Sequence, residues 1–150
     1  MRAKLLASTL VALIGVAPLS GARAVEINTG YFGEVAIRGY DPVAYFTEGK
    51  AIRGAASHEF EWLGATWRFS SEQHRDLFAA SPASYAPQYG GLCSEGVAAD
   101  GEATVSIDPE SWQIIDGKLY LSAAAHFQNR KFDLASGNSN WSMAHAKLLQ

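Results

Sequence analysis

One residue limits how this chain can be stabilised. Its 150 residues include a single cysteine, Cys93. The chain therefore cannot form an internal disulfide, and its fold must rest on a buried apolar core. A chain of this length can bury such a core within one domain, and we expect a single domain over residues 25–150.

The first 24 residues predict where the protein works. Arg2 and Lys4 form a short positive segment, and residues 5–17 form an apolar run without a charge. The sequence ARA at residues 22–24 has the small-x-small pattern of a cleavage site. We therefore expect a signal peptide that is cleaved after Ala24 and a periplasmic mature chain. We expect no membrane span, because the apolar run is too short.

Charge argues against nucleic acid as a partner. The whole chain carries a formal net charge of −3, and loss of Arg2, Lys4 and Arg23 with the leader leaves −6. A nucleic-acid binder needs clustered basic residues to replace phosphate counterions.

In an oxidising periplasm the thiol of Cys93 has three possible states: it is buried and inert, paired with another chain, or chemically used.

Apolar periodicity predicts two β-hairpins. His58, Phe60 and Trp62 alternate with glutamates, which is the period of a half-buried strand, and residues 66–69 form the return strand. A second hairpin is expected from residues 112–115 and 119–121, with Asp-Gly at 116–117 as a type I′ turn.

Capping patterns predict about five short helices. Asp41 before Pro42 is typical of a helix start. Ser70 is expected to cap the helix over 71–80, with Leu77 and Phe78 facing the core. Further short helices are expected over residues 42–46, 92–97 and 122–134. Another helical turn is expected to start at Ser81-Pro82, and a last helix is expected to be capped by Asn138 or Ser139. The sum is a small α+β domain, and no internal repeat is apparent after residue 25.

Cys93, His74 and His126 are the candidate metal ligands. Cys93 follows two glycines in the first turn of a predicted helix, where backbone N–H groups favour a thiolate. A thiolate with an imidazole can hold copper or another soft transition metal. The alternative to a metal site is that Cys93 is packed in the core and that the two histidines lie solvated on helices.

Tyrosines and glycines near the two turns are the candidate ligand-lining residues. Tyr has an apolar body and a polar tip, so it can line a small polar pocket; the alternative is an aromatic core. The residues expected to line or orient the site are Tyr40, Asp41, Tyr89, Gly90 and Gly91.

Several motifs resemble the YHS domain. These are DPV at residues 41–43, GATWRFSS at 64–71 and FAASPASY at 78–85. The longer motifs GYDPVAYF at 39–46 and YAPQYGGLC at 85–93 resemble exported bacterial YHS-domain proteins, and DPESW at 108–112 and DGKLYL at 116–121 continue that likeness.

The resemblance implies a small α+β module of a kind associated with heavy-metal handling, notably in copper transporters. The metal-type YHS domain has cysteines where this chain has Ala44, Ser70 and His74. The exported subgroup instead has its cysteine at the position of Cys93, and some relatives carry selenocysteine there.

Three hypotheses follow for the function. In the first, Cys93 and either His74 or His126 bind a metal ion, with copper as the first candidate, or a small ligand lies near Cys93. In the second, Cys93 is a redox thiol that forms a sulfenic acid or a mixed disulfide with a periplasmic partner. In the third, the chain is a structural or interaction module with an inert Cys93.

Overall fold

The computed structural model describes residues 27–31, 33–100, 104–125 and 127–148. The predicted signal peptide and His126 lie outside these residues. Among the helices of this part of the chain, none combines the length and the apolar character that a membrane span requires.

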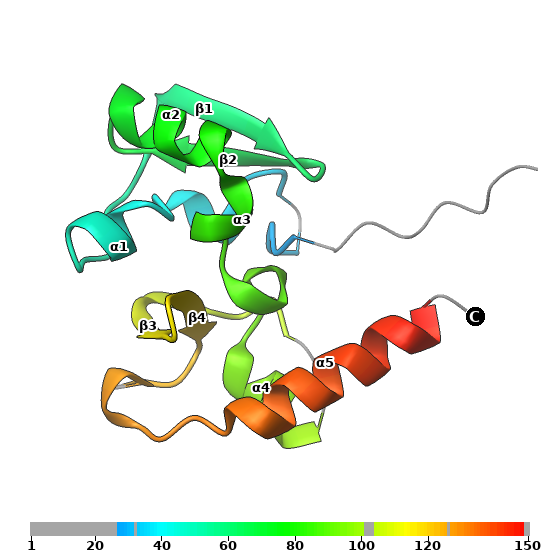
Figure 1. Cartoon of the computed structure of the whole chain (residues 1–150). Coiled ribbons are helices and arrows are strands. Elements are labelled where there is room, and N and C mark those ends of the chain that lie inside the picture. The colour runs from blue at the N-terminus through cyan, green and yellow to red at the C-terminus, as the bar shows by residue number, and fades with distance from the viewer. Residues whose placement is uncertain (1–26, 32, 101–103, 126, 149–150) are drawn as a thin grey trace, which may run out of the picture.

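Two antiparallel β-hairpins and several short helices form a small mixed α+β domain, as the sequence predicts (Figure 1). The strands are β1 (Ala55–Trp62), β2 (Ala65–Phe69), β3 (Asp108–Ile115) and β4 (Lys118–Ser122). The α-helices are α1 (Ala44–Thr47), α2 (Glu72–Ala80), α3 (Pro82–Tyr85), α4 (Ser94–Asp100) and α5 (Leu134–Leu148). Three 3-10 turns complete the order: η1 (Ala36–Gly39), η2 (Gln88–Gly91) and η3 (Phe127–Asn129).

The hairpins form where the sequence alternates. β2 buries Ala65, Trp67 and Phe69, whereas the glutamates of β1 are exposed. Asp116 and Gly117 have φ values of 50° and 72°, and positive φ at both central residues is what the predicted type I′ turn requires.

Two details predicted for α2 are wrong. Ser71, not Ser70, caps the helix and accepts the N–H of His74, because Ser70 binds Asp41 instead. Phe78 is fully buried but Leu77 is 36% exposed, because only one narrow stripe of this short helix faces the core.

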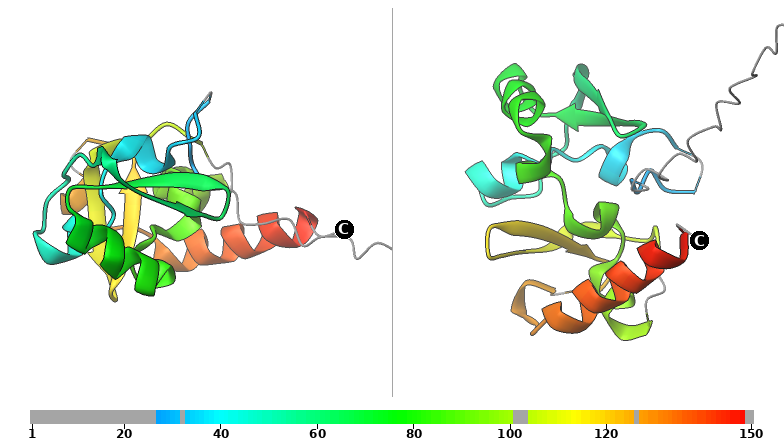
Figure 2. Two further views of the ribbon diagram at one scale, coloured as in Figure 1. Left: turned by 90° about the horizontal axis from the view of Figure 1, so that it is seen from above. Right: turned by 45° about the vertical axis from the view of Figure 1, so that its right-hand side comes forward.

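The predictions for the C-terminal segment are also wrong. Residues 122–134 are not one helix: β4 runs to Ser122, and α5 begins at Leu134 rather than near residue 138. Asp133 provides the start signal, since its Oδ1 accepts the N–H of Ser136 at 3.0 Å. Beyond its contact with α4, α5 extends past the other elements (Figure 2).

The backbone shows an internal repeat that the sequence pattern did not indicate. We call residues 34–80 the first unit and residues 86–129 the second unit. Each opens with a 3-10 turn in which three successive residues have positive φ, at positions 37–39 (41°, 58°, 78°) and 89–91 (55°, 64°, 82°). In each, the next residue is extended, and its N–H bonds back to the carbonyl of residue 37 or 89.

The two units then continue in the same order. A short helix, α1 or α4, precedes a hairpin. β1 and β3 each have 8 residues, β2 and β4 each have 5, and both hairpins have a register irregularity near the start of the first strand. The first unit ends in α2, whereas the second ends in η3. The expectation that the chain has no internal repeat is therefore wrong.

One apolar core joins the two units. It combines Trp67 and Phe78 of the first unit with Leu119 and Leu121 of the second, and it also includes Cys93. A smaller aromatic cluster lies between the second unit and α5; its buried members are Tyr89, Val97, Tyr120 and Phe127. In Figure 1 the first unit forms the upper half of the molecule and the second unit the lower half.

Candidate functional site

Asp41 is a fully buried carboxylate at the centre of the first unit. Its Oδ1 accepts the N–H groups of Val43 (2.9 Å) and Ala44 (3.3 Å) where α1 begins, as its position before a proline predicts. Its Oδ2 accepts the N–H (2.9 Å) and the hydroxyl (2.7 Å) of Ser70 at the end of β2. Asp41 therefore ties the start of α1 to the first hairpin.

α2 brings His74 against the same carboxylate. His74 Nδ1 lies 2.6 Å from Asp41 Oδ2, and the His74 side chain is 11% exposed. Because a carboxylate only accepts, Nδ1 donates, and the ring is held with Nε2 facing outward. Such carboxylate–histidine pairs commonly stand behind histidines that ligate metals.

The outer nitrogen of His74, Nε2, faces the side chains of Thr47, the last residue of α1, and of Glu48, which follows it. Nε2 lies 3.3 Å from Thr47 Oγ1, whose hydroxyl donates to the carbonyl of Val43, and 3.7 Å from Glu48 Oε1. A nitrogen lone pair beside a carboxylate is favourable only with positive charge between them. A bound cation would supply such a charge.

Cys93 lies in a separate network, directly before α4 in the second unit. Its Sγ accepts the N–H of Ala123 at 3.4 Å and lies 3.8 Å from Ser122 Oγ. Its own N–H donates to the carbonyl of Thr104 at 3.0 Å, and the residue is 7% exposed. The thiol is thus buried beside the end of β4.

A polar chain runs from this thiol toward the surface. The Ser122 hydroxyl donates to Glu95 Oε2 at 2.7 Å, and Glu95 Oε1 pairs with Arg130 Nη1 at 3.2 Å. The Arg130 side chain is 55% exposed and that of Glu95 is 28% exposed. The order Cys93, Ser122, Glu95 gives a thiol proton a route to a carboxylate.

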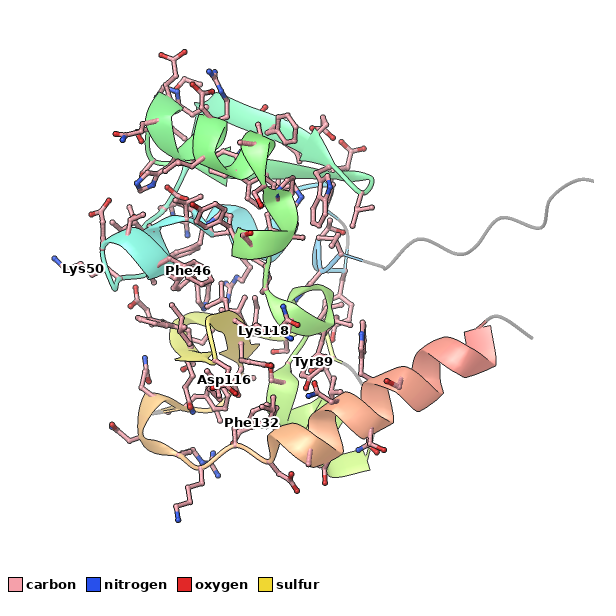
Figure 3. All side chains as sticks on the ribbon, viewed as in Figure 1. Phe46, Lys50, Tyr89, Asp116, Lys118 and Phe132 are labelled. Carbon is pink, nitrogen blue, oxygen red and sulfur yellow. The ribbon has the colours of Figure 1, made fainter. Side chains whose placement is uncertain are left out.

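Tyr89 lies in the aromatic cluster beneath α5. Its hydroxyl donates to Asn138 Oδ1 at 3.0 Å, and its ring packs against Tyr120, Phe132 and Trp141. Figure 3 shows Tyr89 and Phe132 on the side of the second unit that faces α5. The contacts of Tyr89 are therefore those of a residue in an aromatic core, the alternative to a residue that lines a ligand pocket.

The other candidate lining residues also have contacts within the protein. The Tyr40 ring lies 5.0 Å from the guanidinium carbon of Arg53. The carbonyl of Gly90 accepts the Asn28 N–H, and the carbonyl of Gly91 accepts the Asn28 side-chain amide, both at 2.8 Å. These bonds fix the backbone of η2 ahead of Cys93.

We expect Tyr89 to make the folded protein less stable in alkali. Burial, and then the neighbouring Tyr120, raise the pKa of Tyr89 from 10.0 to about 12. The folded state therefore favours the neutral phenol, so this contribution is complete below pH 10 and is lost as the pH rises through 12. Urea midpoints measured across this range should fall less steeply for Tyr89→Phe than for the wild type. An equal fall of the urea midpoint with pH in both proteins would contradict a raised pKa of Tyr89 in the folded state.

The structure brings together only some of the expected site residues. Asp41 and His74 share one hydrogen-bonded network in the first unit, whereas Cys93 and Tyr89 belong to two other sets of contacts in the second. Within the described ranges, no three His, Cys, Asp or Glu side chains are placed to share an ion.

Sequence reasoning missed Glu48 and Thr47 beside His74, and Glu95 and Ser122 beside Cys93. These neighbours have no local signal in the sequence, because the fold joins distant parts of the chain at each site.

Comparison of the chain with family models, with curated proteins and with solved structures finds no match.

Proposed function

We propose that the chain is an exported, YHS-like metal-binding protein of the periplasm that holds a divalent cation, copper first, at His74. The observation that carries this proposal is the orientation of the imidazole. Asp41 holds Nδ1 at 2.6 Å, and Nε2 is left facing the carboxylate of Glu48 at 3.7 Å.

The donors fit a divalent transition metal. Nitrogen and oxygen ligands lie about 2.0–2.2 Å from such an ion, so two ligands of one ion stand about 3–4 Å apart. The spacing between His74 Nε2 and Glu48 Oε1 falls in that interval. Imidazole and carboxylate suit Cu(II) and Zn(II), and Cu(II) binds such donors most tightly among the first-row divalent ions. Two protein ligands leave positions for water or for a group from a partner.

The proposal keeps one of the ligands expected from the sequence and sets another aside. His74 remains the imidazole ligand, and Asp41 orients it. Cys93 is not in this ligand set, because its sulfur contacts Ser122 and Ala123 in the other unit. His126 lies outside the described residues and stays a prediction.

Titration calorimetry with Cu(II) and with Zn(II) tests the proposal. Glu48→Gln removes a half-exposed carboxylate without opening the core, and we expect at least about tenfold weaker binding. Glu72→Gln is the matched control, because Glu72 is an exposed glutamate at the start of α2 and pairs with Arg75 instead. Its affinity should equal that of the wild type.

Two further variants decide where the ion is bound. His74→Gln should abolish specific binding, and Cys93→Ser should leave it unchanged. Unchanged affinity in both Glu48→Gln and His74→Gln would refute the site. Loss of binding in Cys93→Ser would place the ion on the thiol instead.

A further inference from the structure

The outer edge of β1 carries main-chain groups that point away from β2. Thr66 stands opposite Glu61 in the hairpin, and its N–H donates to the carbonyl of Glu34 at 2.8 Å, on the side of β2 away from β1. In an antiparallel pair whose two residues do not bond to each other, both point their N–H and C=O groups outward. Glu61 therefore presents a main-chain donor and acceptor at the outer edge of β1, and so does Glu59, two residues earlier.

The internal repeat shows that the second unit covers the corresponding strand. The Gln128 side-chain amide of η3 donates to the carbonyl of Glu110 in β3, and the Gln113 side-chain amide of β3 donates to the carbonyl of Arg130 at 3.0 Å. In the first unit α2 follows the hairpin instead, and its Phe78 packs on the apolar face of β1. The edge of β1 is left open, along the top of the molecule in Figure 1.

The open edge is a matter of hydrogen bonds as well as of shape. Within the part of the chain that the structure describes, no main-chain bond from another segment reaches the N–H or C=O groups of Glu59 and Glu61. Such a row of donors and acceptors is a template for pairing with one more strand.

We propose that the outer edge of β1 binds an extended segment of a partner protein, in which lysine or arginine alternates with apolar residues and which adds a third strand to the first hairpin. Strand addition takes its affinity from main-chain hydrogen bonds and its specificity from alternate side chains. The proposal goes beyond the cation site at His74 and does not depend on it.

The two faces of β1 determine which side chains the added strand carries. Glu59 and Glu61 are exposed on one face, where Glu59 pairs with Arg68 at 2.8 Å and, in the described ranges, no basic side chain pairs with Glu61. That face has a surplus of negative charge, which basic side chains on the adjacent strand would balance. On the other face Phe60 and Trp62 are half-buried, and they offer apolar surface to the residues in between.

A second copy of the chain fits this edge poorly. Two β1 edges that met would bring the glutamates of one copy beside those of the other, and like charges on neighbouring strands are destabilising. Charged side chains on an edge strand commonly protect against such self-association. The same charges favour a basic segment, so they select the partner over the copy.

Hydrogen exchange followed by NMR tests the proposal. The probe is a short peptide that alternates lysine with valine, added to the chain over residues 25–150. The amides of Glu59 and Glu61 should exchange at least about tenfold more slowly with this peptide, whereas the amide of Phe60, which already bonds to β2, should change little. The control peptide has the same composition with its lysines and valines in two blocks, and it should give no protection.

Two substitutions at one position separate the main chain from the charge. Glu61→Pro removes the outward N–H without breaking a bond to β2, an orientation in which edge strands tolerate proline, so it should fold and lose binding. Glu61→Gln keeps the N–H and removes the charge, so it should bind severalfold more weakly at low salt. Glu72→Gln is the matched control, because Glu72 lies on α2, and its affinity should equal that of the wild type.

Three results would overturn the proposal. The first is no protection of Glu59 and Glu61 at millimolar peptide, or protection that maps outside β1. The second is a folded Glu61→Pro that binds the peptide as the wild type does. The third comes from sedimentation without peptide: a dimer in which both amides are already protected would mean that a second copy covers this edge.

Discussion

Asp41→Ala is expected to lower the free energy of unfolding by about 3–5 kcal/mol, the usual cost of removing one partner from a buried charged network. The side chain is fully buried, so water does not readily take its place as the acceptor. Its loss leaves the N–H groups of Val43, Ala44 and Ser70 without their acceptor, and His74 Nδ1 without its partner. Urea unfolding followed by tryptophan fluorescence measures the change.

Asp41→Asn is the control for this prediction. It retains the volume and one carbonyl acceptor but removes the charge, so the loss should be smaller than for alanine. Ser70→Ala removes only the hydroxyl donor and should cost about 1 kcal/mol. If the free energy of unfolding of Asp41→Ala lies within about 1 kcal/mol of that of the wild type, the carboxylate does not hold the first unit together.

Gly91→Ala should cost about 2–4 kcal/mol, which makes it the second large effect. Gly91 has φ of 82°, a conformation that L side chains rarely adopt. A Cβ there would lie 2.7 Å from Ile37 Cγ2 and 3.1 Å from Pro87 Cγ. Ile37 is fully buried and stiff at χ1, so it cannot move aside easily.

Gly49→Ala separates the two causes of this loss. Gly49 has φ of 62°, and a Cβ added there meets nothing within 4 Å. This variant reports backbone strain alone, about 1 kcal/mol. The excess for Gly91→Ala then measures the close approach of η2 to η1. Equal costs would mean that this packing does not constrain η2, the turn that leads to Cys93.

Local signals in the sequence were enough for the hairpins but not for the repeat. The alternation at Phe60 and Trp62 and the Asp116-Gly117 turn depend on neighbouring residues, so they can be read directly. The repeat is carried by backbone conformation. Ile37 and Tyr89 both take positive φ, although neither side chain favours it, and only the third position of each turn is glycine in both units.

Only the local part of the candidate site could be predicted from the sequence, because its long-range contacts depend on the fold. Asp41 was identified as a helix cap from its place before a proline, and that role is local. Its pairing with His74 joins residues far apart in the sequence through Ser70 and the first hairpin. Cys93 was singled out because it is the only cysteine, yet its neighbours Ser122 and Ala123 come from the end of the second hairpin, which composition cannot indicate.

The most direct test of the proposed cation site is the electron paramagnetic resonance spectrum of Cu(II) bound to the chain over residues 25–150. We expect coupling to an imidazole nitrogen that is present in the wild type and in Cys93→Ser and is lost in His74→Gln. A spectrum that keeps this coupling in His74→Gln, or that changes to that of free Cu(II) in Cys93→Ser, would contradict it.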